Sequence, residues 1–278
     1  MRGTGARVSA LVRASHPEPT VAVTAVAMGL AVSLGRDGAG VAAVAVAVLS
    51  GQLSIGWLND AVDAARDSLT GRADKPIATR AISRRTVTAA TVVAALVCVP
   101  VSLASGVLAG TTHLLAVASG WAYNLGVKST PFSVVPYALA FGLLPTFVVL
   151  GLPGSPPPPW WLPVAGALLG AGAHFANVLP DLADDAVTGV RGLPHRLGAT
   201  GSRMAAGVLL LAASVVLAAA APVAVFVALC VPVLAAVVLT TGFLAGRRDG
   251  SRAPFRAVLV VAVVDVALLL TAGHAVVA

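Results

Sequence analysis

Apolar runs of roughly 18 or more residues recur along the whole sequence, and each is long enough to cross the hydrocarbon core of a bilayer as a helix. Charged residues make up only 10% of the chain, whereas a soluble domain carries about 25%. The polar segments between the runs are only long enough to be loops. The pattern predicts an all-α, polytopic membrane protein.

We expect nine membrane-spanning helices, separated by turn segments such as "SLGRDGAG" and "PGSPPPPW". The segment before the first of them is basic, but it has no continuous apolar core ahead of its prolines, so we do not expect a cleaved signal peptide. The predicted helices cover residues 18–35, 39–62, 85–105, 109–127, 132–151, 160–181, 202–220, 222–245 and 256–277.

The basic residues predict the orientation of these helices. With nine spans, 17 of the 18 Lys and Arg fall on one side of the membrane, and only Arg36 faces the other. The positive-inside rule then places the N-terminus in the cytoplasm and the C-terminus outside. Topology and contact with anionic lipid headgroups account for the net charge of +7, so no nucleic-acid partner is expected. The 17 residues are Arg2, Arg7, Arg13, Arg66, Arg72, Lys75, Arg80, Arg84, Arg85, Lys128, Arg191, Arg196, Arg203, Arg247, Arg248, Arg252 and Arg256.

An acidic segment occurs twice in the sequence. Residues 59–71 read "NDAVDAARDSLTG" and residues 177–189 read "NVLPDLADDAVTG". Five positions match at one offset of 118 residues, and both copies begin at the cytoplasmic end of a predicted helix. We therefore expect a parallel internal repeat within one transmembrane domain over residues 1–278, folded as two four-helix bundles plus a ninth helix. The matches pair Asn59, Asp63, Asp67, Thr70 and Gly71 with Asn177, Asp181, Asp185, Thr188 and Gly189.

The spacing within each copy predicts a cation site. Residues at i, i+4 and i+8 lie along one face of a helix, so each copy should present one amide and two carboxylates from a single stripe. Carboxylates at a helix C-terminus oppose the macrodipole unless cations bind there. Oxygen ligands without His or Cys suit Mg²⁺, which usually shares its coordination shell with substrate phosphates. The predicted ligands are Asn59, Asp60, Asp63, Asp67, Asn177, Asp181 and Asp185.

Basic residues flank both acidic segments and predict the rest of a diphosphate site. Arg72 and Lys75 follow the first segment, Arg191 follows the second, and Lys128 ends the predicted helix at 109–127. Guanidinium and ammonium groups beside carboxylates and a metal would balance the remaining negative charge of a diphosphate. We therefore expect these four residues to bind the substrate.

At these segments the sequence resembles the UbiA superfamily of intramembrane prenyltransferases. "NDAVDAARD" is similar to the NDxxDxxxD signature of the family, and "GRADKPIATRAIS" to the loop that follows it. "NVLPDLADD" with "TGVRGLPHRLG" resembles the second acidic motif and its trailer, and "YNLGVKSTP" resembles the loop after the fourth helix. The resemblance implies a nine-helix fold, a central cavity open sideways to lipid, and Mg²⁺-dependent transfer of a prenyl group from an isoprenyl diphosphate.

Carried over by position, the resemblance implies that one metal is bound by the first motif and another by the second, with catalytic carboxylates at Asp63, Asp67, Asp181 and Asp185. The second motif departs from the first, because Val178 stands where the first has Asp60, and Asp184 is a candidate replacement ligand. The resemblance also favours an aromatic acceptor for the prenyl group. Candidate residues on the acceptor side are Tyr123, Asn124, His174, Trp57 and Ser54, whereas Asp265 in the last predicted helix has no assigned role.

Two other functions use the same features. A terpene cyclase of this fold would bind the same diphosphate and let the cation attack its own chain, and the motifs do not separate it from a transferase. A secondary transporter would place polar residues near the bilayer midplane, whereas these acids lie at the predicted cytoplasmic ends of helices. The sequence therefore favours a prenyltransferase in the cell membrane with its active site on the cytoplasmic side, and leaves the acceptor, the donor length and the oligomeric state open.

Overall fold

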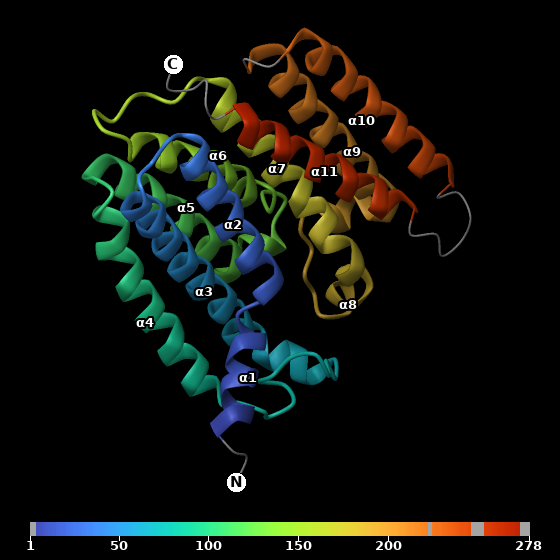
Figure 1. Ribbon diagram of the computed structural model, residues 1–278. Coiled ribbons are helices and arrows are strands. Elements are labelled where there is room, and N and C mark those ends of the chain that lie inside the picture. The colour runs from blue at the N-terminus through green and yellow to red at the C-terminus, as the bar shows by residue number, and fades with distance from the viewer. Residues whose placement is uncertain (1–3, 222–223, 246–252, 273–278) are drawn as a thin grey trace.

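The computed structural model describes residues 4–221, 224–245 and 253–272, which are helical apart from turns and loops, with no strand among them (Figure 1). The α-helices are α1 (Thr4–Ala14), α2 (Pro17–Ser33), α3 (Gly38–Leu69), α4 (Arg84–Leu103), α5 (Val107–Leu125), α6 (Val135–Leu150), α7 (Trp161–Val178), α8 (Leu182–Val187), α9 (Leu193–Ala220), α10 (Val225–Ala245) and α11 (Ala253–Ala272). Two 3₁₀ turns, η1 (Val127–Ser129) and η2 (Leu179–Asp181), follow α5 and α7.

Six helical segments are long and apolar enough to cross a membrane by length and composition. They are Gly38–Leu69, Arg84–Leu103, Trp161–Asp181, Leu193–Ala220, Val225–Ala245 and Ala253–Ala272. The helices α2 and α6 are apolar but shorter, with 17 and 16 residues. The chain is therefore an all-α, multi-pass membrane protein, and the count of nine crossings stays a prediction.

The first acidic motif lies on one continuous helix. The side chain of Asp37 caps the start of α3 by accepting a 2.7 Å hydrogen bond from the backbone N–H of Gly40. The helix then runs for 32 residues to Leu69, seven residues beyond the expected end of the span at 62. It ends where Gly71 adopts a left-handed conformation, with φ 67°. The motif residues at 59, 63 and 67 therefore share one helix.

The second motif does not lie on one helix, so the predicted single stripe through Asn177, Asp181 and Asp185 is wrong there. The helix α7 ends at Val178, and η2 separates it from the six-residue α8. Pro180 lies within η2, where its missing N–H and its ring disfavour a continuing α-helix. The repeat in sequence is thus not a repeat of local backbone.

Two further boundaries differ from the expected ones. The helix α1 lies ahead of the first predicted span, in a segment where no helix was expected. The helix α9 begins at Leu193 rather than at 202, and Gly198 (φ 68°, ψ −179°) kinks it near the expected start. The predicted break at residue 221 agrees with the end of α9 at Ala220, whereas the loop with Arg247, Arg248 and Arg252 lies outside the described residues.

The helix starts have the same spacing as the acidic motifs. Pro17, Val135 and Ala253 begin α2, α6 and α11 at intervals of 118 residues. Val107 and Val225, which begin α5 and α10, are also 118 residues apart. The remaining starts do not keep this spacing, because α3 and α7 begin 123 residues apart and α4 and α9 begin 109 residues apart.

Two buried apolar clusters hold the helices together. One joins α2, α3, α6 and α7 around Phe147 and Leu162, and the other joins α7, α9, α10 and α11 around Leu210 and Val261. In Figure 1, α7 lies between the group α2–α6 and the group α9–α11. A Cβ atom at Gly166 would collide with the carbonyl oxygen of Phe141, so this glycine lets α6 and α7 approach closely.

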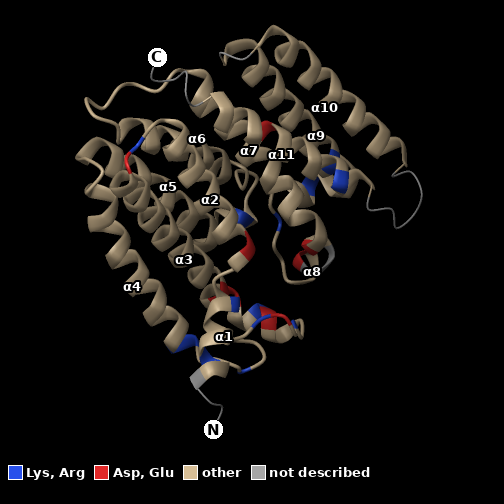
Figure 2. Cartoon of the chain, viewed as in Figure 1, with Lys and Arg blue, Asp and Glu red and all other residues tan. Residues whose placement is uncertain are grey.

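Charged residues gather at one end of the helices. In Figure 2 the blue and red segments concentrate near α1, near α8 and in the loop that follows α3. Both acidic motifs lie in this region, so the fold brings together segments that are more than 100 residues apart in the sequence.

Candidate active site between the two acidic motifs

Asp63 lies at the centre of the charged network. The ammonium group of Lys128 donates to both of its carboxylate oxygens, at 2.5 and 2.7 Å. Arg66 Nη2 donates to the same carboxylate at 2.9 Å, and Asn59 Nδ2 donates to it at 3.1 Å. The side chain of Asp63 is only 7% exposed, so this negative charge is held by two cations away from bulk water.

Lys128 reaches Asp63 from the turn after α5. Gly126 (φ 151°) ends α5, and Lys128 follows in η1 with its side chain 10% exposed. Burial lowers the pKa of Lys128, and the neighbouring Asp63 offsets only part of this effect. The backbone of this turn is also packed on the segment after the second motif, because a Cβ at Gly192 would collide with the carbonyl oxygen of Lys128. The turn thereby contacts both halves of the chain.

Arg66 joins the two motifs. Besides its bond to Asp63, its guanidinium lies 3.8 Å from Asp67 Oδ1 and 3.6 Å from Asp185 Oδ1. Three carboxylates, two from the first motif and one from the second, therefore surround one cation. From the sequence, Arg66 was counted only among the basic residues that predict the membrane orientation, and its position between the two motifs was missed. Its position i+3 from Asp63 on the same helix was the available signal.

Asp185 and Asp181 complete the second side of the site. Asp185 Oδ2 lies 3.3 Å from His195 Nε2, and burial raises the pKa of Asp185. Asp181 accepts a 3.1 Å hydrogen bond from Arg72 Nη1, although its side chain is 44% exposed. Two arginines of the first half thus reach carboxylates of the second.

The loop after α3 carries two predicted substrate-binding residues. Arg72 donates two 2.9 Å hydrogen bonds to Asp74, and these bonds lower the pKa of Asp74 to about 2. Lys75 Nζ lies 3.3 Å from Asp60 Oδ1, and Asp60 is almost completely buried. Both cations therefore lie beside the acidic motifs.

The predicted residues on α5 and α7 fall into two groups. Asn124 accepts a 3.0 Å hydrogen bond from Asn59 and donates one of 3.0 Å to the carbonyl oxygen of Ile55, so it joins α5 to the first motif. Tyr123 and His174 instead belong to an aromatic cluster. Their ring centroids are 5.6 Å apart, and both rings contact Tyr137, at 5.1 and 4.9 Å.

Tyr137 was missed by the sequence reading because it lies in the middle of an apolar segment. Its hydroxyl accepts a 3.2 Å hydrogen bond from Asn177 Nδ2, so the aromatic cluster is attached to the second motif. His174 Nε2 lies 3.1 Å from Ser133 Oγ, while its Nδ1 is buried without a hydrogen-bond partner. Of the other candidates, Trp57 donates to the carbonyl oxygen of Leu11, and Ser54 accepts from Trp121.

Three predicted positions are not brought into the network. Arg191 is exposed and forms no ion pair with a described carboxylate. Asn177 is exposed and contacts Tyr137 rather than the carboxylates. The side chain of Asp184 lies outside the part of the structure that is described.

The donor atoms fit a hard divalent cation in chemistry, although they are not assembled around one point. Within the described ranges, no three His, Cys, Asp or Glu side chains lie close enough together to hold a metal ion. The carboxylates are paired with Arg66, Lys128, Arg72 and Lys75 instead. Yet Asp67 Oδ2 and Asp60 Oδ2 are buried and have no hydrogen-bond partner in the described part of the chain, and such oxygens are costly to leave unpaired. An oxygen-only set with unpaired buried acceptors suits Mg²⁺.

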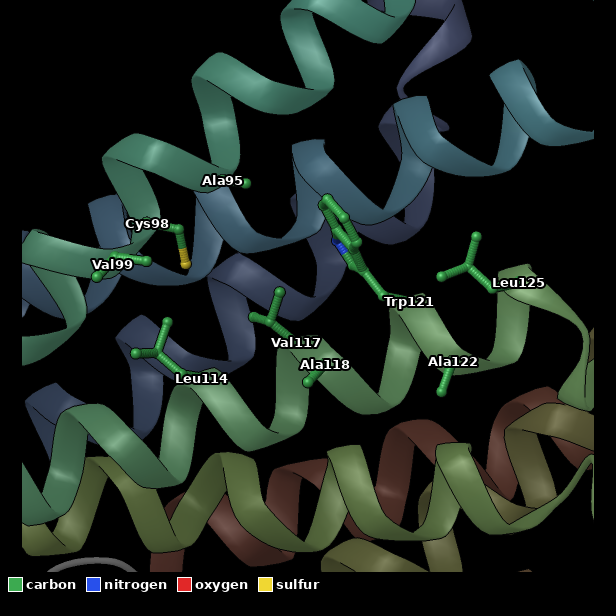
Figure 3. A pocket seen from close by; sticks show the side chains of 9 residues that line it. All are labelled: Ala95, Cys98, Val99, Leu114, Val117, Ala118, Trp121, Ala122 and Leu125. Carbon is green, nitrogen blue, oxygen red and sulfur yellow. The ribbon is translucent and has the colours of Figure 1, made fainter.

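A separate apolar pocket of about 340 Å³ lies between α4 and α5 (Figure 3). It is lined by Ala95, Cys98, Val99, Leu114, Val117, Ala118, Trp121, Ala122 and Leu125. None of the acidic or basic residues lines it, and the neighbouring Asn124 bonds to α3 and the first motif instead. We therefore place the candidate active site at the charged network and not at this pocket.

Asp265, which had no assigned role, is completely buried in α11. Its Oδ1 lies 2.6 Å from Ser214 Oγ of α9, which links two helices of the second group. Because it is distant in sequence from both motifs and pairs with a hydroxyl, its contacts are those of a packing residue between helices.

Comparisons with known proteins bear on the fold and the family of this chain. A search of curated protein sequences finds no match. Among solved structures, a UbiA homolog from Archaeoglobus fulgidus bound to GPP and Mg²⁺ is 19% identical with a TM-score of 0.70, covering 96% of this chain and 99% of that one. An apo UbiA homolog from Aeropyrum pernix K1 is 20% identical with a TM-score of 0.72, covering 93% and 98%. A digeranylgeranylglyceryl phosphate synthase is 14% identical with a TM-score of 0.69, covering 98% of each chain.

These similarities establish the fold. The sequence model of the UbiA prenyltransferase family matches residues 20–269. This range is most of the chain and includes both acidic motifs. The chain therefore belongs to the UbiA prenyltransferase family.

Proposed function

We propose that this protein transfers an isoprenyl group from a prenyl diphosphate to a small-molecule acceptor, with the help of Mg²⁺ and from the cytoplasmic side of the membrane. The observation that carries the proposal is the position of Arg66, which lies within 4 Å of carboxylates from both acidic motifs. Acids and cations from the two halves of the chain thus meet at one place, as a single diphosphate site requires.

The residues have distinct roles in this proposal. Mg²⁺ would be held by oxygen ligands from both motifs, which are Asn59, Asp60, Asp63 and Asp67 from the first and Asn177, Asp181 and Asp185 from the second. Bound Mg²⁺ would offset the negative charge of the diphosphate as it leaves. Lys128, Arg72 and Lys75 already lie within 3.3 Å of a motif carboxylate, so their free N–H groups can donate to diphosphate oxygens. Arg191 is exposed and forms no ion pair with a described carboxylate, so its predicted role in binding has the least structural support of the four basic residues.

The departing diphosphate leaves an allylic cation that must be kept from water. The cluster of Tyr123, Tyr137 and His174 lies beside the second motif and presents aromatic faces, which attract cations. The acceptor would attack from this side. An aromatic acceptor is the preferred choice from the family resemblance, and the relatives whose structures contain GPP or DMAPP with Mg²⁺ support a prenyl diphosphate as donor.

The experiment that tests this function is an assay of the purified protein in detergent. We expect diphosphate release and a prenylated product when prenyl diphosphates of several lengths are incubated with Mg²⁺ and a panel of aromatic acceptors, with products identified by mass. Donor alone should give little product. A cyclic hydrocarbon formed from donor alone would indicate a cyclase, and absence of diphosphate release under all conditions would contradict both enzymes.

The proposed orientation predicts the side of each loop. Reporter fusions at residues 75, 128 and 195 should report a cytoplasmic location, and those at 37, 107 and 155 an external one. The reason is the clustering of Lys and Arg at the end of the helices that carries the motifs. External activity for a fusion at residue 128 would place the active site on the wrong side of the membrane and contradict the proposal.

A further inference from the structure

The junction between α1 and α2 is packed directly on the helix of the first acidic motif. Ala10 and Ala14 of α1 are completely buried in a cluster with Ala61 of α3 and with Ile82 and Val87. Trp57 Nε1 donates a 2.9 Å hydrogen bond to the carbonyl oxygen of Leu11. The N-terminal segment is therefore held against α3 within one turn of Asn59.

The α1–α2 junction and α3 approach each other closely. A Cβ atom at Gly56 would collide with the carbonyl oxygen of Ser15, so only glycine allows the backbone of the junction to lie on α3. The same carbonyl oxygen accepts a 2.9 Å hydrogen bond from Thr20 Oγ1, and Ser15 Oγ donates to the carbonyl oxygen of Val12 at 2.7 Å. These contacts fix the residue that follows, His16.

His16 has an unusual backbone conformation. Its φ of 54° and ψ of 66° lie in the left-handed region, which a residue other than glycine occupies only when the surrounding structure holds it there. Its side chain does not cap α2, although it occupies the N-cap position. The surrounding contacts thus hold His16 in a strained conformation, and the ring is directed to the first motif and not to its own helix.

The ring of His16 contacts Lys75. His16 Nε2 lies 3.1 Å from Lys75 Nζ. An ammonium group has three N–H donors and no acceptor, so Nε2 must accept this hydrogen bond. Lys75 in turn lies 3.3 Å from Asp60 Oδ1.

Lys75 depends on these partners for its position. It lies in the loop between α3 and α4, and its side chain has several rotatable bonds. Its Nζ lies 3.1 Å from His16 Nε2 and 3.3 Å from Asp60 Oδ1, so these two partners account for at most two of its three N–H donors. The ammonium is consequently held beside the first motif by His16, which lies just before α2.

We infer that His16 is a positioning residue, which holds the ammonium of Lys75 at the first acidic motif so that its free N–H can bind the diphosphate of the donor. This role rests on the proposed function. It assigns part of the substrate site to the α1–α2 junction, and it explains why that junction is kept in a strained conformation. A purely structural role for the junction would affect stability alone.

The test measures binding of geranyl diphosphate with Mg²⁺ to the full-length protein in detergent by titration calorimetry, so no acceptor is needed. We expect His16→Ala to weaken binding about tenfold, the scale for losing one hydrogen bond to a charged group. His16→Gln places an amide oxygen near the position of Nε2, and it should bind within about threefold of the wild type.

A double-mutant cycle separates positioning from an independent effect. If His16 acts through Lys75, Lys75→Met should weaken binding at least as much as His16→Ala. Adding His16→Ala to Lys75→Met should then change the affinity by less than about twofold, because coupled residues are not additive. The matched control is Thr24→Val, which removes a 2.7 Å hydrogen bond to the carbonyl oxygen of Thr20 within α2 and leaves the contacts of Ser15, His16 and Lys75 in place. It should lower the unfolding temperature and leave the affinity unchanged.

Each outcome is decisive. Unchanged affinity in His16→Ala, additive losses in the double variant, or an equal loss of affinity in Thr24→Val would overturn the role of His16, provided the wild type binds. Failure of the wild-type protein to bind the donor would overturn the proposed function and this role with it.

Discussion

Removal of divalent cations with EDTA should reduce diphosphate release from a prenyl diphosphate to background, and Mg²⁺ should restore it. The reason is electrostatic. The two motifs bring five carboxylates, of Asp60, Asp63, Asp67, Asp181 and Asp185, against the four cations Arg66, Arg72, Lys75 and Lys128, so a diphosphate entering this site meets more negative than positive charge. The buried Oδ2 of Asp67, which has no hydrogen-bond partner among the described residues, would suit a further cation. The measurement is diphosphate release in detergent at constant ionic strength.

Two controls distinguish a bound metal from general screening of charge. Replacing Mg²⁺ with K⁺ at equal ionic strength should not restore the reaction, because screening does not supply an oxygen-coordinating ion. Mg²⁺ added to the protein without donor should raise the unfolding temperature, since a ligand that binds the folded state stabilises it. Full turnover in EDTA would contradict the role of the carboxylates as metal ligands.

The residues of the first motif could be predicted well from the sequence. The spacing of Asn59, Asp63 and Asp67 fits one helical face, and α3 continues through all three. The same inference failed for the second motif because Pro180 lies between Asn177 and Asp181. The proline was visible in the sequence, and it shows that a match in sequence does not guarantee a match in backbone.

The partners of the motif residues could not be predicted in the same way. Lys128 is 65 residues from its partner Asp63, and His16 is 59 residues from its partner Lys75. Only Arg66, which is three residues from Asp63 on the same helix, has a signal in the local sequence. The junction at His16 depends on tertiary contacts of α1, a helix with weak sequence signals of its own. Asp265 illustrates the same limit, since its partner Ser214 is 51 residues away on another helix.

Asp63→Asn and Asp181→Asn should each reduce turnover by at least about 10²-fold, the scale of losing one preorganised electrostatic contact. These carboxylates are equivalent by the 118-residue offset, and Arg66 joins their two motifs in space. If they serve one diphosphate, they act as a unit. The double variant should then be little worse than the worse single variant, because groups that act together are strongly non-additive. Turnover is measured as diphosphate release at saturating Mg²⁺ and donor.

Asp181→Asn is the cleaner of the two variants. Its side chain is 44% exposed, so the substitution should leave the unfolding temperature nearly unchanged. Asp63→Asn leaves the ammonium of Lys128 buried without its carboxylate, and that cost to stability must be measured separately.

Asp74 lies outside both motifs but is unsuitable as a control, because it holds Arg72 on Asp181. Asp37→Asn, at the opposite end of α3, keeps a residue that can cap the helix and should change turnover by less than about twofold. Two independent sites would leave each single variant with about half its activity and make the double variant inactive, and that pattern would exclude a single convergent site.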